Sequence, residues 1–94
     1  MTWPFDQQPN VAALTCKTVM NGAPVLLVSH DLEDHSWTFL DGQVWRAEEA
    51  LVVGMKTILD AQPQLAEIVD LPPGWIARRA GVSDPWVREL DASD

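Results

Sequence analysis

Cysteine, basic side chains and long apolar runs are all scarce in this sequence of 94 residues. Its single cysteine, Cys16, excludes an intrachain disulfide and favours a reducing compartment. Residues 1–6 show neither the basic start nor the apolar run of a signal peptide, so we expect a cytoplasmic protein. The longest apolar runs, residues 25–28 and 50–53, are far shorter than the roughly 20 residues that cross a bilayer, so no membrane-spanning helix is expected.

Acidic residues outnumber basic ones by 14 to 6, which gives a formal net charge of −8. Because negative charge repels phosphate backbones and anionic lipids, neither nucleic acid nor a membrane is an expected partner. Two interpretations of the charge stay open. It keeps a small domain in solution, or it attracts a basic partner protein.

Length and composition predict one folded domain. Hydrophobic residues make up 47% of the chain, as in ordinary globular proteins, and a chain of this length holds one hydrophobic core. We therefore expect a single domain over residues 1–94. Within it, residues 1–10 lack a regular period and predict an irregular arm, and residues 89–94 predict a frayed tail.

The first half contains the signals of two β-hairpins. A period-two pattern over residues 11–20 predicts a strand, and Asn21-Gly22 is typical of the tight turn of a hairpin. An apolar strand is expected over residues 25–29, directly after Pro24. The residues expected on the inward face of the first strand are Ala12, Leu14, Cys16 and Met20.

A second hairpin is expected around Asp41-Gly42. Trp37 and Phe39 alternate with polar residues as in a strand, and residues 43–46 would form the return strand. Trp45 of that return strand would then pair with Trp37 across the sheet.

The second half predicts a strand over residues 50–53 and a helix over 55–61 with Gly54 as its N-cap. A continuous helix over 47–61 is the competing interpretation. The further elements expected are a helical segment over 64–69 that begins at Pro63, a stop over 70–74, a strand over 75–80 and a turn over 83–86. The sum is an α+β fold: a small antiparallel sheet of two hairpins plus one or two further strands, packed on a short helical segment.

Several segments resemble a group of small uncharacterised bacterial proteins. They are Leu71-Pro72-Pro73-Gly74-Trp75, Ala77-Arg78, Asp84-Pro85-Trp86, Val25–Asp31 and Trp37–Leu40. In general build the chain also resembles a bacterial family of unknown function that includes predicted immunity proteins of toxin systems. These resemblances imply a small cytosolic α+β protein and supply no catalytic residue. The chain departs from the pattern at Gly54 and Gln62, where better helix-capping residues are expected.

Residues 30–35 gather two imidazoles and three carboxylates, which are ligand types of zinc and other divalent metals. They predict a metal site formed by His30, Asp31 and His35. No second ligand pair with a recognisable spacing accompanies them. The alternative is a solvated acidic loop between two strands.

Conventional catalysis has little support. Cys16 is expected in the core as a small apolar residue, and adjacent Ser29 and His30 would point to opposite faces of a strand. The sequence contains no nucleophile elbow, phosphate-binding glycine loop or dinucleotide fingerprint. We therefore expect no enzyme and no cofactor.

Five tryptophans in a chain without tyrosine are the most unusual feature of its composition. Trp75 and Trp86 lie close in sequence to Arg78, Arg79 and Arg88, and tryptophan and arginine are enriched at the centres of protein interfaces. A partner-binding surface is therefore predicted at Trp75, Arg78, Arg79 and Trp86. The alternative is that the tryptophans fasten loops to the domain while the arginines pair with surface carboxylates.

Together these observations predict a protein-binding module of the inhibitor or immunity type, with a basic protein as its partner. The rival hypothesis is a small metal- or ligand-binding protein that uses the segment from His30 to His35. A third is a homodimer subunit whose thin core is completed across the interface.

Overall fold

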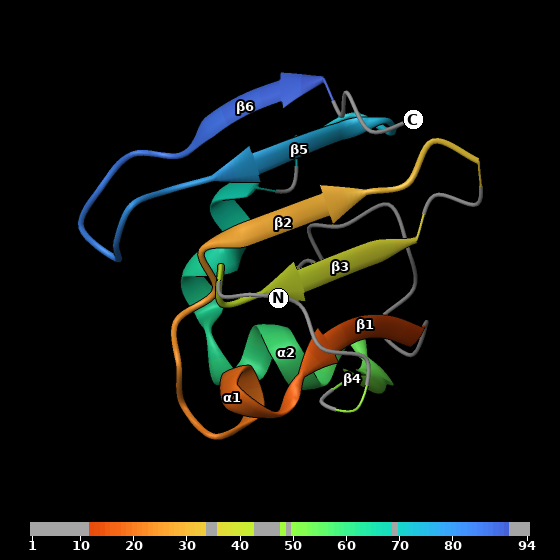
Figure 1. The fold of residues 1–94 in the computed structure, drawn as a ribbon, viewed down its shortest axis with the longest axis vertical. Coiled ribbons are helices and arrows are strands. Elements are labelled where there is room, and N and C mark those ends of the chain that lie inside the picture. The colour runs from red at the N-terminus through yellow and green to blue at the C-terminus, as the bar shows by residue number, and fades with distance from the viewer. Residues whose placement is uncertain (1–11, 34–35, 43–47, 49, 69, 91–94) are drawn as a thin grey trace.

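The computed structural model describes residues 12–33, 36–42, 48, 50–68 and 70–90. In this part of the chain six strands form one sheet in the order β4-β1-β3-β2-β5-β6, and α1 and α2 lie at the lower left in the view of Figure 1. The strands are β1 (Ala12–Cys16), β2 (Leu27–His30), β3 (Trp37–Leu40), β4 (Ala50–Gly54), β5 (Trp75–Arg78) and β6 (Val87–Leu90). The helical segments are α1 (Lys17–Met20), α2 (Met55–Ala61) and the 3₁₀ helix η2 (Pro63–Ile68). The expected α+β fold is confirmed.

Antiparallel pairing dominates the sheet. Among the described strands, β1 and β3 are the neighbours that run parallel, and the other adjacent pairs are antiparallel. The buried hydroxyl of Thr15 supports the parallel pair, because its Oγ1 donates a hydrogen bond of 2.7 Å to the carbonyl of Phe39. No helix of the described residues is long and apolar enough to cross a membrane.

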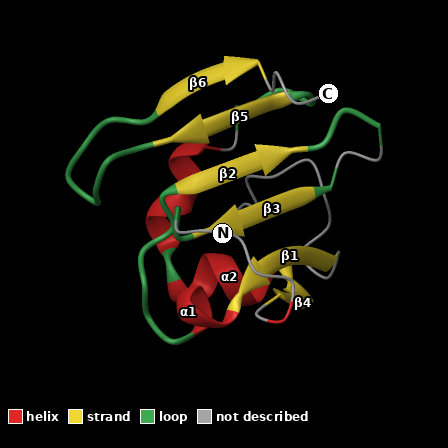
Figure 2. Ribbon diagram, in the orientation of Figure 1, coloured by secondary structure: helices red, strands yellow, loops and turns green. Residues whose placement is uncertain are grey.

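The core lies between one face of the sheet and the helical segments, which gather on one side of the strands in Figure 2. We call this the inner face of the sheet and the opposite one the outer face. Strand registers place Val28, Phe39 and Ala77 side by side on the inner face. The main side chains that pack there are Ala13, Val28, Trp37, Phe39 and Ala77 from the sheet with Met55, Ile58, Leu65 and Ile68 from α2 and η2.

The first predicted strand is shorter than expected and has the opposite face inward. β1 ends at Cys16, and residues 17–20 form α1. Ala13 and Thr15 are buried, whereas Ala12 is exposed and Leu14 is only half-buried. Because small or apolar residues occupy both sides of this segment, its period-two pattern does not identify the inward side. Cys16 is buried as expected, at the point where the strand becomes a helix.

The predicted hairpin at Asn21-Gly22 is wrong, because these residues end α1. The amide of Gly22 donates to the carbonyl of Val19, and the amide of Ala23 donates to the carbonyl of Thr18. This bonding pattern satisfies the last carbonyls of a helix and requires a left-handed residue, here Gly22 with φ +109°. The chain therefore leaves β1 in a helix, and β3 lies between β1 and β2 in the sheet.

The predicted return strand over 43–46, with Trp45, lies outside the described residues. The observed hairpin instead joins β2 to β3, so the acidic segment from His30 to His35 spans its connection. Trp37 begins β3 and stacks on His30 of β2, with ring centroids 4.0 Å apart.

Predictions for the second half are largely confirmed. The helix over 55–61 has the expected bounds and Gly54 as its N-cap, so a continuous helix over 47–61 is wrong. The segment after Pro63 is helical, although of the 3₁₀ type, and it buries Leu65 and Ile68. β5 confirms a strand that begins at Trp75, but it ends at Arg78 and not at residue 80 as predicted. β6 was not predicted, and it includes Glu89 and Leu90, which we expected in a frayed tail.

Candidate functional site

The β5–β6 hairpin presents an open edge of the sheet. β6 pairs with β5 from Trp75 opposite Leu90 to Arg78 opposite Val87, and no strand of the described residues lies beyond it. All four residues of β6 are exposed, including Val87 at 56% and Leu90 at 66%. An edge strand with exposed apolar side chains can pair with a further strand.

Arg79 anchors the hairpin at the start of the β5–β6 connection. Its side chain is buried, at 7% exposure. Nε and Nη2 donate to the carbonyl of Val25 at 3.2 and 3.0 Å, and Nη1 donates to Gln64 Oε1 at 3.2 Å and to the carbonyl of Val82 at 3.3 Å. Within the described residues the guanidinium therefore finds neutral oxygens and no carboxylate. These hydrogen bonds compensate its burial and tie the hairpin to η2 and to the loop before β2.

Trp86 lies against this guanidinium. The guanidinium carbon of Arg79 is 4.4 Å from the centre of the Trp86 ring, which is a cation–π contact. The ring is half-buried and packs against the core, and its Nε1 is buried without a hydrogen-bond partner among the described residues. Stacking on Arg79 and apolar packing therefore hold Trp86 in place.

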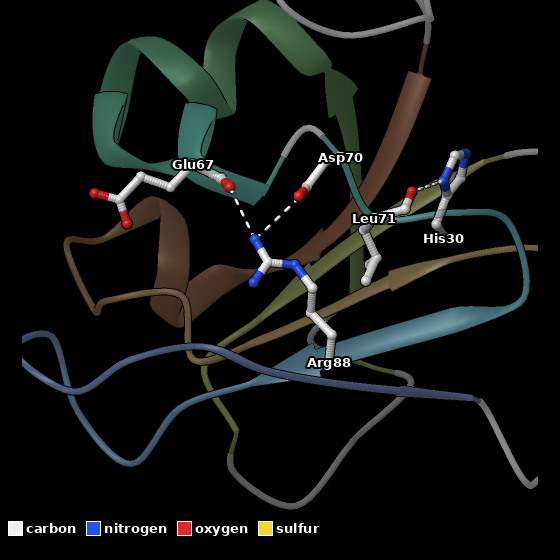
Figure 3. A network of polar contacts seen from close by, with 5 residues as sticks. All are labelled: His30, Glu67, Asp70, Leu71 and Arg88. Atoms are coloured by element: carbon white, nitrogen blue, oxygen red, sulfur yellow. Dashed lines mark hydrogen bonds and ion pairs between the residues drawn. The ribbon is translucent and has the colours of Figure 1, made fainter.

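Arg88 connects β6 to the end of η2, as Figure 3 shows. Its Nη2 donates to the carbonyl of Glu67 at 3.1 Å and to Asp70 Oδ1 at 3.0 Å. Because both side chains of the ion pair are partly exposed, the pair contributes little to stability, but it directs Arg88 along the inner face. Between η2 and the loop over 82–86 lies a groove of about 510 Å³, lined by Glu67, Trp86 and Arg88 among others.

The four predicted partner-binding residues do not form one patch. Arg79 and Trp86 lie together in a cation–π contact. Arg78 is exposed on the outer face, where Nη2 lies 2.8 Å from Glu89 Oε1. Trp75 is half-buried on the inner face at the other end of β5. Arg79 is thus an internal anchor. The prediction of a partner-binding surface applies only to the more exposed residues around it.

His30 is an internal residue of the β2–β5 junction. It is 3% exposed, and its Nδ1 donates to the carbonyl of Leu71 at 2.7 Å, as Figure 3 shows. In return, the amide of Gly74 donates to the carbonyl of His30 at 2.7 Å. With its ring stacked on Trp37, His30 holds the segment before β5 against β2.

Of the other two predicted metal ligands, the structure describes only Asp31. Asp31 is exposed, and its Oδ1 accepts a hydrogen bond from the amide of Glu33 at 2.8 Å, which shapes the loop. His35 lies outside the described residues. Within the described part of the chain, no group of three or more His, Cys, Asp or Glu side chains is placed to hold a metal ion.

Sequence reasoning missed Val87 and Leu90, and it placed Arg88 in no element. The segment Val87-Arg88-Glu89-Leu90 has its apolar residues three positions apart, which is a helical spacing. A strand exposed on both faces shows no alternation of apolar and polar residues. The available signal was the turn predicted over residues 83–86 after the predicted strand, which indicates a chain reversal.

Comparison of the chain with protein-family models, with curated proteins and with solved structures gives no match. The resemblance to small bacterial proteins therefore stays a prediction. The geometry of the hairpin is distinctive on its own: its edge strand is open among the described residues, and Arg79 and Arg88 anchor it.

Proposed function

We propose that this chain is a protein-binding module of the inhibitor or immunity type, which binds an extended segment of its partner along β6. The observation that carries the proposal is the exposure of all four β6 residues at the edge of the described sheet. An edge strand offers a row of backbone N–H and C=O groups, and a partner segment that adds to it gains main-chain hydrogen bonds together with side-chain contacts.

The anchoring of the hairpin supports this proposal. Arg79 fastens the start of the β5–β6 connection, and Arg88 fastens β6 itself to η2. A partner strand therefore meets an edge that is already ordered, which reduces the entropy lost on binding. Val87 and Leu90 supply exposed apolar surface on this edge.

The charge of the protein favours a basic partner. The formal net charge is −8, and of the exposed carboxylates around the hairpin, Asp70 and Glu89 pair with Arg88 and Arg78, while Glu67 and Asp84 add negative charge beside them. Complementary charge accelerates encounter and rejects acidic competitors more than it adds affinity. The proposal places the module in the bacterial cytoplasm, with which the free, buried thiol of Cys16 is compatible.

The two edges of the sheet provide a matched test. Leu90→Lys introduces a charge on the β6 edge, and Val52→Lys introduces the same charge on the β4 edge at a residue that is 70% exposed. A protein retained from a lysate of the native bacterium is purified, and its Kd is measured against each variant. We expect Leu90→Lys to weaken binding by about tenfold or more, and Val52→Lys to leave Kd within about twofold of wild type.

Equal effects of the two substitutions would contradict binding at β6. So would a larger effect of Val52→Lys. Failure of the immobilised wild-type protein to retain any partner from that lysate would count against the protein-binding function itself.

A further inference from the structure

The side chains of β6 determine which strands can pair with it favourably. We infer, resting on the proposed function, that β6 pairs antiparallel with a partner segment of the pattern apolar–basic–acidic–apolar, and that it rejects a second copy of this chain. The inference deepens the proposal because it names the chemistry of the partner strand.

The strand register assigns each β6 side chain to a face. Arg88 lies opposite Ala77, which is fully buried, and Arg88 itself reaches η2, so it belongs to the inner face. Glu89 lies opposite Ile76 and pairs with Arg78 on the outer face. Because side chains alternate along a strand, Leu90 shares the inner face with Arg88, and Val87 shares the outer face with Glu89.

This arrangement disfavours pairing of β6 with itself. A symmetric antiparallel pair has its two-fold axis perpendicular to the sheet, so residues directly opposite one another must lie on the same face. Two such registers pair three of the four residues of β6. One places Arg88 against its own copy, and the other places Glu89 against its own copy. Like charges directly opposite one another are destabilising, so a symmetric dimer in which β6 pairs with its own copy is disfavoured.

A different strand can place a complementary residue opposite each of the four positions, and its charges would add to the existing pairs of Glu89 with Arg78 and of Arg88 with Asp70. In an antiparallel partner, successive residues face Leu90, Glu89, Arg88 and Val87 in that order. The complementary pattern is therefore an apolar residue, a basic one, an acidic one and a second apolar one. The apolar residue opposite Leu90 would extend the inner-face surface begun by Trp75, which lies opposite Leu90 on β5.

Two synthetic peptides of equal composition test the pattern with the full-length protein. Both have ten residues with lysine and threonine flanks, and their central residues are Val-Lys-Glu-Val or Val-Glu-Lys-Val. Equal net charge removes long-range attraction as a variable. We expect the first peptide to bind about tenfold more tightly, measured by the shifts of the β6 amide signals in NMR titrations. The second restores the same charge pairs only by running parallel to β6, which is the less stable arrangement.

Three further measurements make the outcome decisive. Glu89→Lys should abolish the preference for the first peptide, and Leu90→Lys should weaken both peptides. A spin label on the peptide N-terminus should broaden the amide signal of Leu90 more than that of Val87. Sedimentation of the wild-type protein at about 100 μM should show a monomer, since an unfavourable self-pairing leaves the edge open.

Equal affinity of the two peptides at β6 would overturn the inferred pattern while leaving strand addition, and so the proposed function, intact. Failure of both peptides to bind at millimolar concentration would overturn the inference as well. A dimer that Leu90→Lys dissociates would show that a second copy is the occupant. The lysate experiment with Leu90→Lys and Val52→Lys decides the proposed function separately from all of these.

Discussion

The two edge strands of the described sheet, β4 and β6, are attached to the domain in different ways. At β4, four of the five strand residues are half-buried, and the chain turns directly into α2, whose Met55 and Ile58 enter the core. At β6, all four residues are exposed, and besides the pairing of β6 with β5 the polar contacts of Arg79 and Arg88 connect the hairpin to the rest of the domain. Apolar packing thus secures one edge, and hydrogen bonds position the other.

This difference shows how a small domain can keep an edge available. A thin core cannot cover both sides of every strand, because the fraction of the surface that is buried on folding is smaller in shorter chains. Here the helices cover the strands from β4 towards β5, and the last strand extends beyond them. An edge placed outside the core can change sequence with little effect on folding, which is what a binding edge requires.

Removal of core packing behind β4 should have the largest effect on stability. Ile58 of α2 is 1% exposed, and Ile58→Ala should lower the free energy of unfolding by about 3 kcal/mol through lost burial and a residual cavity. Urea unfolding followed by circular dichroism measures the change. The control is Thr57→Ala on the exposed side of the same helix, which should change stability by only a few tenths of a kcal/mol. Similar losses for both variants would show that α2 is not held by its buried side.

Loss of the Arg79 anchor should come second, and it should act mainly on the hairpin. Arg79→Ala removes four hydrogen bonds of a buried cation and should lower the free energy of unfolding by roughly 2 kcal/mol. Amide hydrogen exchange should accelerate in β5 and β6 more than in β4. Arg79→Lys keeps the charge but not the planar fork, so it should recover only part of the loss. Uniform acceleration across the sheet would contradict a local role.

The parts of the fold that sequence predicted are those with local signals. Gly54 before a helical spacing and Pro63 after it gave the bounds of α2 and the start of η2. The order of the strands has no such signal. Asn21-Gly22 suits a hairpin turn and a helix end equally well, and only the pairing of β1 with the distant β3 and β4 decides between them.

The candidate site was also predicted only in part, because sequence reveals contacts between residues that are close in the chain and not those between distant ones. Trp86 and Arg79 are close in sequence, so their proximity in space could be anticipated. The burial of Arg79 could not, because its acceptor at Val25 lies 54 positions away and becomes available only in the folded sheet. His30 shows the same limit, since its partner at Leu71 is 41 positions away. The residue type of His30 suggested a metal ligand, but its tertiary contacts place it in the interior.

Backbone strain introduced at the end of α1 should destabilise the protein less than Ile58→Ala or Arg79→Ala. Gly22 has φ +109°, and a Cβ built there meets nothing within 4 Å, so Gly22→Ala is opposed by backbone conformation alone. We expect a loss of about 1 kcal/mol in the free energy of unfolding. Gly22→Asn should lose less, because asparagine tolerates left-handed conformations better. A loss above about 3 kcal/mol, measured by the same urea unfolding, would indicate a packing role that the geometry excludes.

The smallest effect on stability is expected at the two edges themselves. Leu90→Lys and Val52→Lys replace side chains that are 66% and 70% exposed, so each should change the free energy of unfolding by less than about 0.5 kcal/mol. Leu90→Lys is nevertheless expected to weaken partner binding. A side chain that matters for binding and not for folding belongs to a surface kept for a partner. If urea unfolding instead shows a loss above about 1 kcal/mol for Leu90→Lys alone, Leu90 contributes to the fold and the β6 edge is structural.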